Sequence, residues 1–172
     1  MSCLAEQAKI LMDEAEENNL GVKAENERLE RWYACSLCEQ KYHGFVGCAL
    51  GWACWKTYVG RPEGDNLFGP ALNLLGNGLF AAHHHADALP VREAELSMKR
   101  RLGGSEANIL VLQTNLATAH HMLRELDEAS RILKDVYSKR LELDGEENGD
   151  TISTAGNYAA LLKQQNRLRL VL

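Results

Sequence analysis

The chain has 172 residues, 45% of them apolar, which is enough hydrophobic material to bury a continuous core. It carries 24 acidic and 19 basic residues, a formal net charge of -5, so no basic excess exists to bind nucleic-acid phosphates. No stretch approaches the roughly 18 consecutive apolar residues of a spanning helix, and the N-terminus is acidic rather than a basic-then-apolar signal. We expect a cytoplasmic protein with no membrane insertion, no nucleic-acid partner and five reduced cysteines.

The first predicted element is an amphipathic capping helix within residues 1–21. Apolar residues recur there at spacings of three and four, with acidic residues elsewhere. The apolar positions are Leu4, Ala8, Leu11 and Ala15. The run Asn19 to Gly21 supplies a helix stop.

Residues 22–60 predict a divergent first helical hairpin that is rich in cysteine and tryptophan. Its second helix is expected over residues 44–59, because apolar residues follow a three-four rhythm there. These residues are Phe45, Cys48, Trp52, Trp55 and Val59. In the partner segment, residues 22–40, we expect Leu29, Trp32 and Leu37 to face inward. All three tryptophans are expected in the core rather than in an aromatic binding patch.

A repeated junction divides the rest of the chain. The segments GRPEGDNL, GGSEANIL and GEENGDTI begin at Gly60, Gly103 and Gly145, which are 43 and 42 positions apart. Glycine accepts the left-handed geometry that ends a helix, and Ser, Asp or Asn caps the next one. Each junction therefore predicts a helix stop followed by a helix start.

Between these junctions the apolar spacing is helical rather than alternating. One stripe comprises Ile109, Leu112, Leu116, Ala119 and Leu123, the next comprises Ala129, Ile132, Leu133, Val136 and Tyr137, and the last comprises Ile152, Ala155, Tyr158, Ala159 and Leu162. A helical hairpin of this size cannot bury its apolar face alone, so neighbouring hairpins stack into a solenoid. The sequence thus predicts an all-α solenoid of helix-turn-helix repeats with a period of about 42 residues. The repeats are expected at residues 61–103 and 104–145, with an incomplete one at 146–172.

The repeats resemble those of kinesin light chains, which are of the tetratricopeptide (TPR) type. The resemblance rests on LNLLGNGLFAAHHHADAL and NLATAHHMLRELDEASRILKDVYSKRL, on the linkers, and on small residues twelve positions apart in each unit. These are Gly76 with Ala88 and Ala117 with Ala129. It covers roughly residues 66–167, although His85 and Arg92 replace the aromatic residues usual in the first unit. It implies a non-enzymatic scaffold without a cofactor that binds a protein or peptide on its concave face.

The same resemblance implies where a peptide would bind. Asn115 and Asn157 match the inner-face position where such repeats often place an asparagine that holds a ligand backbone, and Asn77 lies near the corresponding site. An amide both donates and accepts hydrogen bonds, so it reads a peptide backbone without demanding a sequence. Arg124 and Lys163 are candidate partners for an acidic ligand. The alternative is that these asparagines only satisfy contacts between helices.

A second function hypothesis places zinc in the N-terminal third, with the repeats as a spacer. Cys35, Cys38, His43 and Cys48 have the spacing C-x2-C-x4-H-x4-C, which matches a zinc knuckle in the number and type of ligands. The small turn residues of a knuckle are absent, however. The competing interpretation is that these cysteines are small core residues.

Other histidine and glycine patterns favour structural roles. His83, His84 and His85 point in different directions along a helix, so a helix end or turn is expected rather than a metal site. For His121, we expect an ordinary surface contact with Glu125. The G-x-G of Gly76 and Gly78 lacks a preceding strand, which favours close helix packing over a dinucleotide loop.

The C-terminal sequence raises a third possibility, that the chain is a truncated, non-functional fragment of a longer array. QNRLRLVL ends before a second helix would cover the last unit. Solenoid ends need a polar cap, so Leu168, Leu170 and Val171 would favour self-association.

Overall fold

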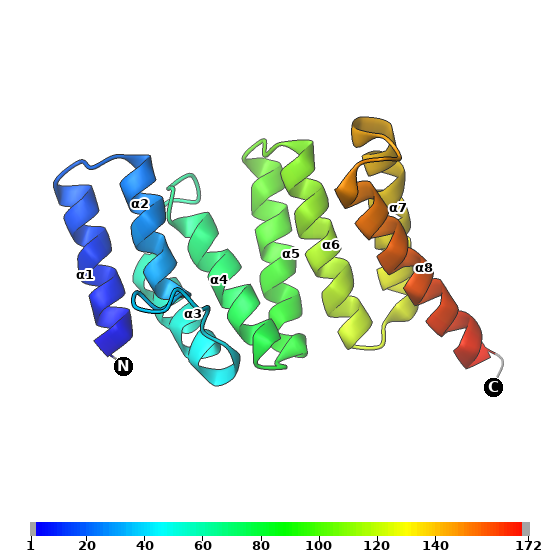
Figure 1. Ribbon diagram of the computed structural model, residues 1–172, viewed down its shortest axis with the longest axis horizontal. Helices are drawn as coiled ribbons and strands as arrows, with labels where there is room; N and C mark the ends of the chain where they lie inside the picture. The colour runs from blue at the N-terminus through cyan, green and yellow to red at the C-terminus, as the bar shows by residue number, and fades with distance from the viewer. Residues whose placement is uncertain (1–2, 170–172) are drawn as a thin grey trace. The chain divides into compact units, whose positions relative to one another are not determined.

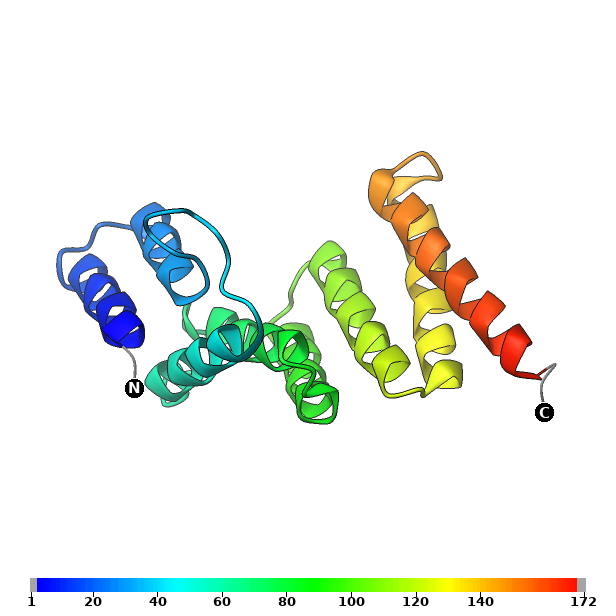
Figure 2. The ribbon, with the colours of Figure 1, turned by 60° about the horizontal axis from the view of Figure 1, so that its bottom comes forward.

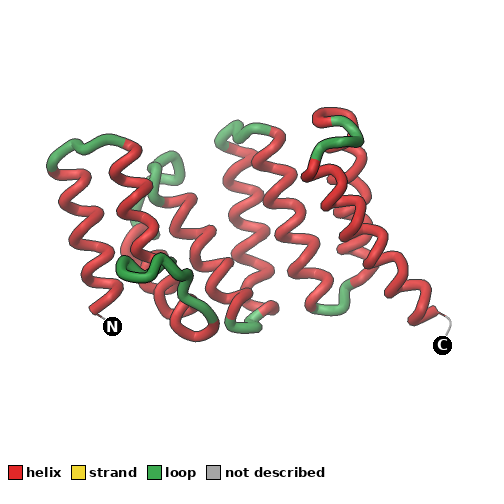
Figure 3. The backbone as a smooth tube through the Cα atoms, in the orientation of Figure 1, coloured by secondary structure: helices red, strands yellow, loops and turns green. Residues whose placement is uncertain are grey.

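The computed structural model describes the backbone of residues 3–169, with side chains through Asn166. Over this range it contains α-helices, one 3-10 turn and loops, and no strand beyond a single isolated bridge (Figures 1 and 3). The helices are α1 (Cys3–Glu17), α2 (Val22–Leu29), η1 (Glu30–Trp32), α3 (Gly44–Tyr58), α4 (Phe68–Ala81), α5 (His85–Arg101), α6 (Glu106–Met122), α7 (Leu126–Asp144) and α8 (Gly149–Arg169). The predicted all-α class is confirmed. No helix in the described range is both long and apolar enough to cross a membrane.

The chain forms two compact units, residues 1–91 and 92–172, which we call the N-terminal and C-terminal units. In the N-terminal unit, α1 packs against α2, η1 and α3. Its core centres on Met12, Trp32, Leu50 and Tyr58, and the rings of Trp32 and Tyr58 meet edge-to-face with centroids 5.9 Å apart. The buried face of α1 consists of Ala5, Ala8, Met12 and Ala15, so the prediction was correct for the two alanines it named but wrong for Leu4, which is exposed.

The apolar stripe predicted for α3 is largely wrong. Phe45 is 82% exposed, Trp52 42% and Val59 46%, whereas Cys48 and Trp55 are buried and half-buried. The reason is that α3 turns its small residues toward α4. A Cβ added at Gly51 would lie 2.7 Å from the carbonyl oxygen of Leu74, and one at Gly78 would lie 2.7 Å from that of Gly47. The two backbones touch where side chains are missing, which confirms close packing at Gly78.

An ion pair joins the end of α1 to the segment after α3. The two terminal nitrogens of the Arg61 guanidinium, Nη1 and Nη2, donate to the carboxylate of Glu16, at 2.5 and 2.7 Å. Arg61 also lies over the ring of Tyr58, 4.9 Å from its centroid. The hydrogen bond from Arg61 lowers the pKa of the Glu16 carboxyl. The pair therefore closes the N-terminal unit across distant parts of its sequence.

In the C-terminal unit, α7 packs against both α6 and α8 (Figure 2). The buried residues of α7 include Ala129, Ile132, Leu133 and Val136, as predicted. In α8 the prediction is displaced by one residue, because Ile152 is 59% exposed while Thr151 and Thr154 are buried. The Thr151 hydroxyl donates to the carbonyl of Arg140 at 3.5 Å, and the Thr154 hydroxyl donates to that of Asp150 at 2.8 Å. Both buried hydroxyls therefore have a hydrogen-bond partner within the protein.

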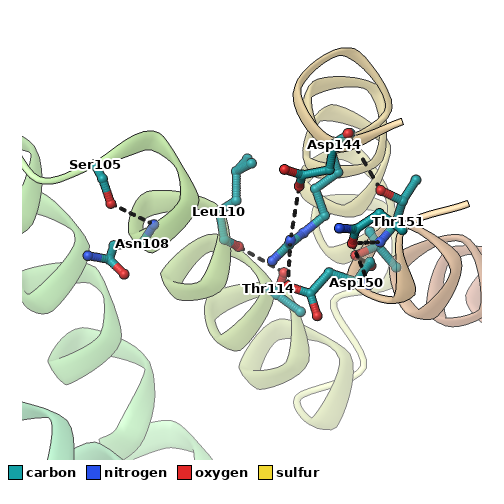
Figure 4. Close-up of polar contacts among 10 residues, drawn as sticks. Ser105, Asn108, Leu110, Thr114, Asp144, Asp150 and Thr151 are labelled. Atoms are coloured by element: carbon teal, nitrogen blue, oxygen red, sulfur yellow. Dashed lines mark hydrogen bonds and ion pairs between the residues drawn. The ribbon is translucent and has the colours of Figure 1, made fainter. Parts of the chain in front are cut away.

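The last two junctions end and restart helices as predicted. Gly103 and Gly145 adopt φ values of 67° and 81°, in the left-handed region that favours glycine, but Gly60 does not, so that part of the prediction is wrong. Ser105 caps α6 by accepting a hydrogen bond from the backbone of Asn108 (Figure 4). At the third junction, Asn148 Oδ1 accepts from the backbone nitrogen of Asp150 at 2.8 Å.

A buried arginine ties α7 to the start of α8. Arg140 is 5% exposed, and its Nη1 donates to Asp150 at 2.9 Å and lies 3.7 Å from Asp144 (Figure 4). This arrangement compensates a buried charge with two carboxylates. Of the residues predicted to promote self-association, Leu170, Val171 and the side chain of Leu168 lie outside the described residues.

Candidate functional site

The C-terminal unit contains a cavity of about 200 Å³ between α6, α7 and α8, which we call the α8 pocket. Its lining consists of Ala117, Thr118, His121, Leu133, Asn157, Ala160, Leu161 and Gln164. The lining includes the buried aliphatic side chains of Leu133 and Leu161. Polar groups come from two helices, with Thr118 and His121 on α6 and Asn157 and Gln164 on α8.

Helical spacing explains why these polar groups meet. On α8, Asn157 and Gln164 are seven positions apart, and on α6, Thr118 and His121 are three apart, so each pair shares one face of its helix. A hydrogen bond of 2.7 Å between His121 Nε2 and Gln164 Oε1 joins the two faces. Gln165 also donates to Asp127 on α7, at 2.9 Å. These contacts fix the position of α8 beside the pocket.

Of the asparagines predicted for a groove in this unit, one lies in a cavity. Asn157 lines the α8 pocket, whereas Asn115, half-buried on α6, does not. Lys163 is exposed and lies six positions beyond Asn157, which turns it about 120° from the pocket face. Arg124 lies in the turn between α6 and α7 with a φ of 66°. Neither basic residue is part of the pocket lining.

Most of the residues that line this pocket were not predicted from the sequence. His121 was expected to contact Glu125, but His120 makes that contact, and its Nδ1 lies 2.5 Å from Glu125 Oε2. His121 instead reaches across to Gln164. The three-residue spacing of Thr118 and His121 indicates that their side chains share one face of α6. It does not indicate that α8 packs against that face.

A second cavity, of about 500 Å³, lies in the N-terminal unit, and we call it the loop pocket. One wall is the loop of residues 33–43 between η1 and α3, and the others are α3 and α4. The loop contributes Tyr33, Lys41, Tyr42 and His43, and the helices contribute Gly47, Gly51, Asn73, Leu74, Asn77, Gly78 and Ala81 beside Trp32. The predicted site residue Asn77 is thus exposed at this pocket, and its Nδ2 donates to Asn73 Oδ1 at 2.9 Å.

Backbone hydrogen bonds hold the loop in a hairpin. Tyr42 donates to the carbonyl of Tyr33 at 2.8 Å, and Cys35 donates to that of Gln40 at 2.9 Å. The hairpin tip is a turn closed by Glu39, whose φ is 57° and whose nitrogen donates to the Cys35 carbonyl at 3.0 Å. Leu37, predicted to face inward, is instead 94% exposed because it sits at this tip.

The predicted zinc ligands do not converge. Cys35 and Cys38 share the hairpin tip, but His43 is exposed at the start of α3, and Cys48 is buried among Leu75, Leu79 and Ala88. In the part of the chain that the structure describes, no group of three or more His, Cys, Asp or Glu side chains is placed to hold a metal ion. The structure therefore gives no support to the zinc-knuckle alternative.

The histidine run lies between helices, as expected. His83 has a φ of 63° in the turn after α4, and His85 begins α5. The ring of His85 packs edge-to-face on Phe80, with centroids 4.7 Å apart. Burial lowers the pKa of His85. The run therefore ends one helix and starts the next, and its three side chains do not form a metal site.

A third cavity, of about 450 Å³, was not anticipated from the sequence. It lies in the C-terminal unit among α5, α6 and α7, and charged residues of both signs line it, including Glu93, Arg100, Glu128, Arg131 and Asp135. Arg131 is already paired with Glu128, and their hydrogen bond lowers the pKa of the Glu128 carboxyl. The charges on the α7 side are thus arranged to neutralise one another.

The geometry defines a helical repeat protein. No family model matches the sequence, and no curated protein matches it. Among solved structures, the crystal structure of BtubC (BKLC) from P. vanneervenii is similar, with a TM-score of 0.62, covering 96% of this chain and 68% of that chain. The sequences are 16% identical, so the likeness concerns the fold. BtubC is a kinesin light chain-like protein, and the similarity supports a TPR-like fold for this chain.

Proposed function

We propose that the protein is a non-enzymatic scaffold that binds a peptide segment of another protein, in the manner of kinesin-light-chain-type TPR repeats. The observation that supports this most is the α8 pocket, which is lined by amide, hydroxyl and imidazole groups together with aliphatic side chains. A few placed polar groups over apolar walls are typical of binding sites.

The proposed repeat boundaries follow the helix pairs. Residues 61–103 include α4 and α5, residues 104–145 include α6 and α7, and α8 is the first helix of a further unit. Residues 22–60 form the divergent hairpin, and α1 within residues 1–21 is the capping helix. In this scheme the α8 pocket lies between the first helices of two successive repeats, which is where an inner-face site would lie.

The chemistry of the pocket indicates the ligand. Its lining contains no Asp, Glu, Lys or Arg, and its volume of about 200 Å³ suits a single uncharged side chain. Asn157 offers both a donor and an acceptor for the ligand backbone beside that side chain. We therefore expect a short extended segment with a small or medium apolar residue at the anchoring position.

A random-peptide library displayed on phage and selected on the full chain tests this proposal. The affinity of selected peptides, measured by fluorescence polarisation, should fall by about tenfold in Asn157→Ala, because one hydrogen bond to the peptide backbone is lost. The matched control is Asn166→Ala, since Asn166 is exposed on the same helix and turned about 180° from Asn157. Peptides that bind both variants as tightly as the wild type would contradict the proposed site.

A further inference from the structure

The tip of the loop hairpin brings two cysteines together. The backbone nitrogen of Glu39 donates to the Cys35 carbonyl four positions earlier, as in one turn of an α-helix, and both Cys35 and Cys38 lie within this turn. Residues three positions apart on an α-helix have Cβ atoms about 5–6 Å apart. A disulfide needs a Cβ separation of about 3.5–4.5 Å. A small closure of the turn is therefore enough to join them.

The surroundings of Cys35 favour its thiolate. The backbone N–H groups of Cys38 and Leu37 donate to the Cys35 sulfur, and the side chains of Cys38 and Tyr42 also contact it. These hydrogen bonds, that from Cys38 first, lower the pKa of the Cys35 thiol. Cys35 is half-buried and Cys38 is exposed, so reagents can reach the pair. A stabilised and accessible thiolate is what makes a cysteine reactive.

The two cysteines inside the N-terminal unit have the opposite character. Cys48 is buried among aliphatic side chains, and burial raises its pKa. Cys54 is fully buried, and burial raises its pKa to about 12. Both are therefore inert core residues, whereas Cys3 is exposed and serves as an internal reference.

We propose that Cys35 and Cys38 form a reversible dithiol–disulfide site that reacts by exchange with a small-molecule disulfide of the glutathione class. The Cys35 thiolate attacks one sulfur of the disulfide RS–SR, the S–S bond breaks, and RS⁻ leaves and takes up a proton from water. The Cys38 thiol then loses its proton to solvent and attacks the Cys35 sulfur of the mixed disulfide, which releases the second RS⁻ as RSH. Two protein thiols are oxidised and one RS–SR is reduced to two RSH.

A disulfide between Cys35 and Cys38 would change the wall of the loop pocket. Tyr42, which contacts the Cys35 sulfur, lines that pocket, and so do Tyr33 and Lys41 at the base of the same hairpin. Closing the turn changes the contact between Cys35 and Tyr42, and the pocket wall moves with it. This inference does not depend on the α8 pocket, which belongs to the other unit.

The test is to equilibrate the full chain with mixtures of reduced and oxidised glutathione and to map the remaining thiols by alkylation and mass spectrometry. We expect a Cys35–Cys38 disulfide to form while Cys48 and Cys54 remain thiols. In the reduced wild-type chain, Cys35 should be alkylated at least about threefold faster than Cys3 at neutral pH. Because this comparison uses the wild-type chain, it holds whether or not a variant folds.

The variants test the order of attack. Cys38→Ser should accumulate a mixed disulfide with glutathione on Cys35, Cys35→Ser should lose the fast reaction, and Cys3→Ser should behave as the wild type. The proposal is overturned if Cys35 reacts no faster than Cys3, or if Cys38→Ser retains no glutathione. It is also overturned if the purified chain carries one zinc ion that protects both thiols from alkylation.

Discussion

The two units reach a packed core by opposite means. In the N-terminal unit, α3 and α4 touch backbone to backbone at Gly47, Gly51 and Gly78. In the C-terminal unit, aliphatic side chains of α7 fill the core, and a buried Arg140 holds the start of α8. At the α3–α4 contact of the first unit the packing depends on missing side chains, whereas around α7 in the second unit it depends on the side chains themselves. The two units should therefore respond differently to the same kind of substitution.

The largest expected effect is at the glycine contact. Gly51→Ala should lower the free energy of unfolding by about 2 kcal/mol, because the new Cβ would lie 2.7 Å from a backbone oxygen that has little room to move. Denaturant unfolding followed by tryptophan fluorescence measures it, since all three tryptophans lie within residues 1–91.

The matched control is the same substitution in the other unit. Gly156 lies inside α8 with nothing within 4 Å of an added Cβ. Gly156→Ala should therefore stabilise the chain by about 0.5–1 kcal/mol, through helix propensity alone. Denaturant unfolding followed by circular dichroism measures it, because residues 92–172 contain no tryptophan. Equal effects of the two substitutions would remove the contrast between the units.

A smaller effect is expected when Arg140 is replaced. Arg140→Met keeps most of the side-chain volume but loses the hydrogen bond to Asp150, and we expect a cost of about 1.5 kcal/mol. Hydrogen exchange followed by mass spectrometry should show faster exchange at the start of α8. Arg131→Met, at an exposed ion pair on the same helix, should leave the free energy of unfolding nearly unchanged. If both variants behave alike, the buried arginine does not hold α8.

The smallest effect is expected at the Glu16–Arg61 pair. Because Glu16 is partly exposed, Glu16→Gln should cost only about 0.5 kcal/mol near neutral pH. The pKa of Glu16 is lowered in the folded state, so its contribution is complete above the ordinary value of 4.5 and is lost as the pH falls through the lowered folded pKa.

The wild-type and Glu16→Gln chains should therefore have equal stability in strong acid and differ above pH 4.5. Thermal unfolding followed by circular dichroism at a series of pH values measures the difference. A difference that does not change with pH would show that the carboxylate charge is not involved.

The fold class could be predicted from the sequence because it depends on local signals. Apolar periodicity correctly predicted the buried residues of α7, and Gly103 and Gly145 correctly predicted two helix ends with left-handed geometry. The face of α3 could not be predicted in the same way. Periodicity assumes that large apolar residues are buried, and on α3 the buried side is marked by glycine, while Phe45 and Trp52 remain exposed.

The candidate sites were less accessible to sequence reasoning. Asn157 and Asn77 could be named from the repeat pattern, and both line cavities. Their neighbours could not be named, because His121 meets Gln164 across 43 positions and only the packing of α6, α7 and α8 brings them together. The cysteine spacing suggested zinc because a count of ligands does not reveal that Cys48 points into the core.

The order in which helices contact one another bears on how quickly the chain folds. In the C-terminal unit the main contacts join helices that follow one another, α6 with α7 and α7 with α8, so each can form as soon as its hairpin closes. The N-terminal unit differs, because α1 also packs against α3, which follows α2 and η1 in the sequence. Closing a longer loop costs more chain entropy before any contact compensates it. The unit that contains the glycine contact should therefore be the slower of the two to fold.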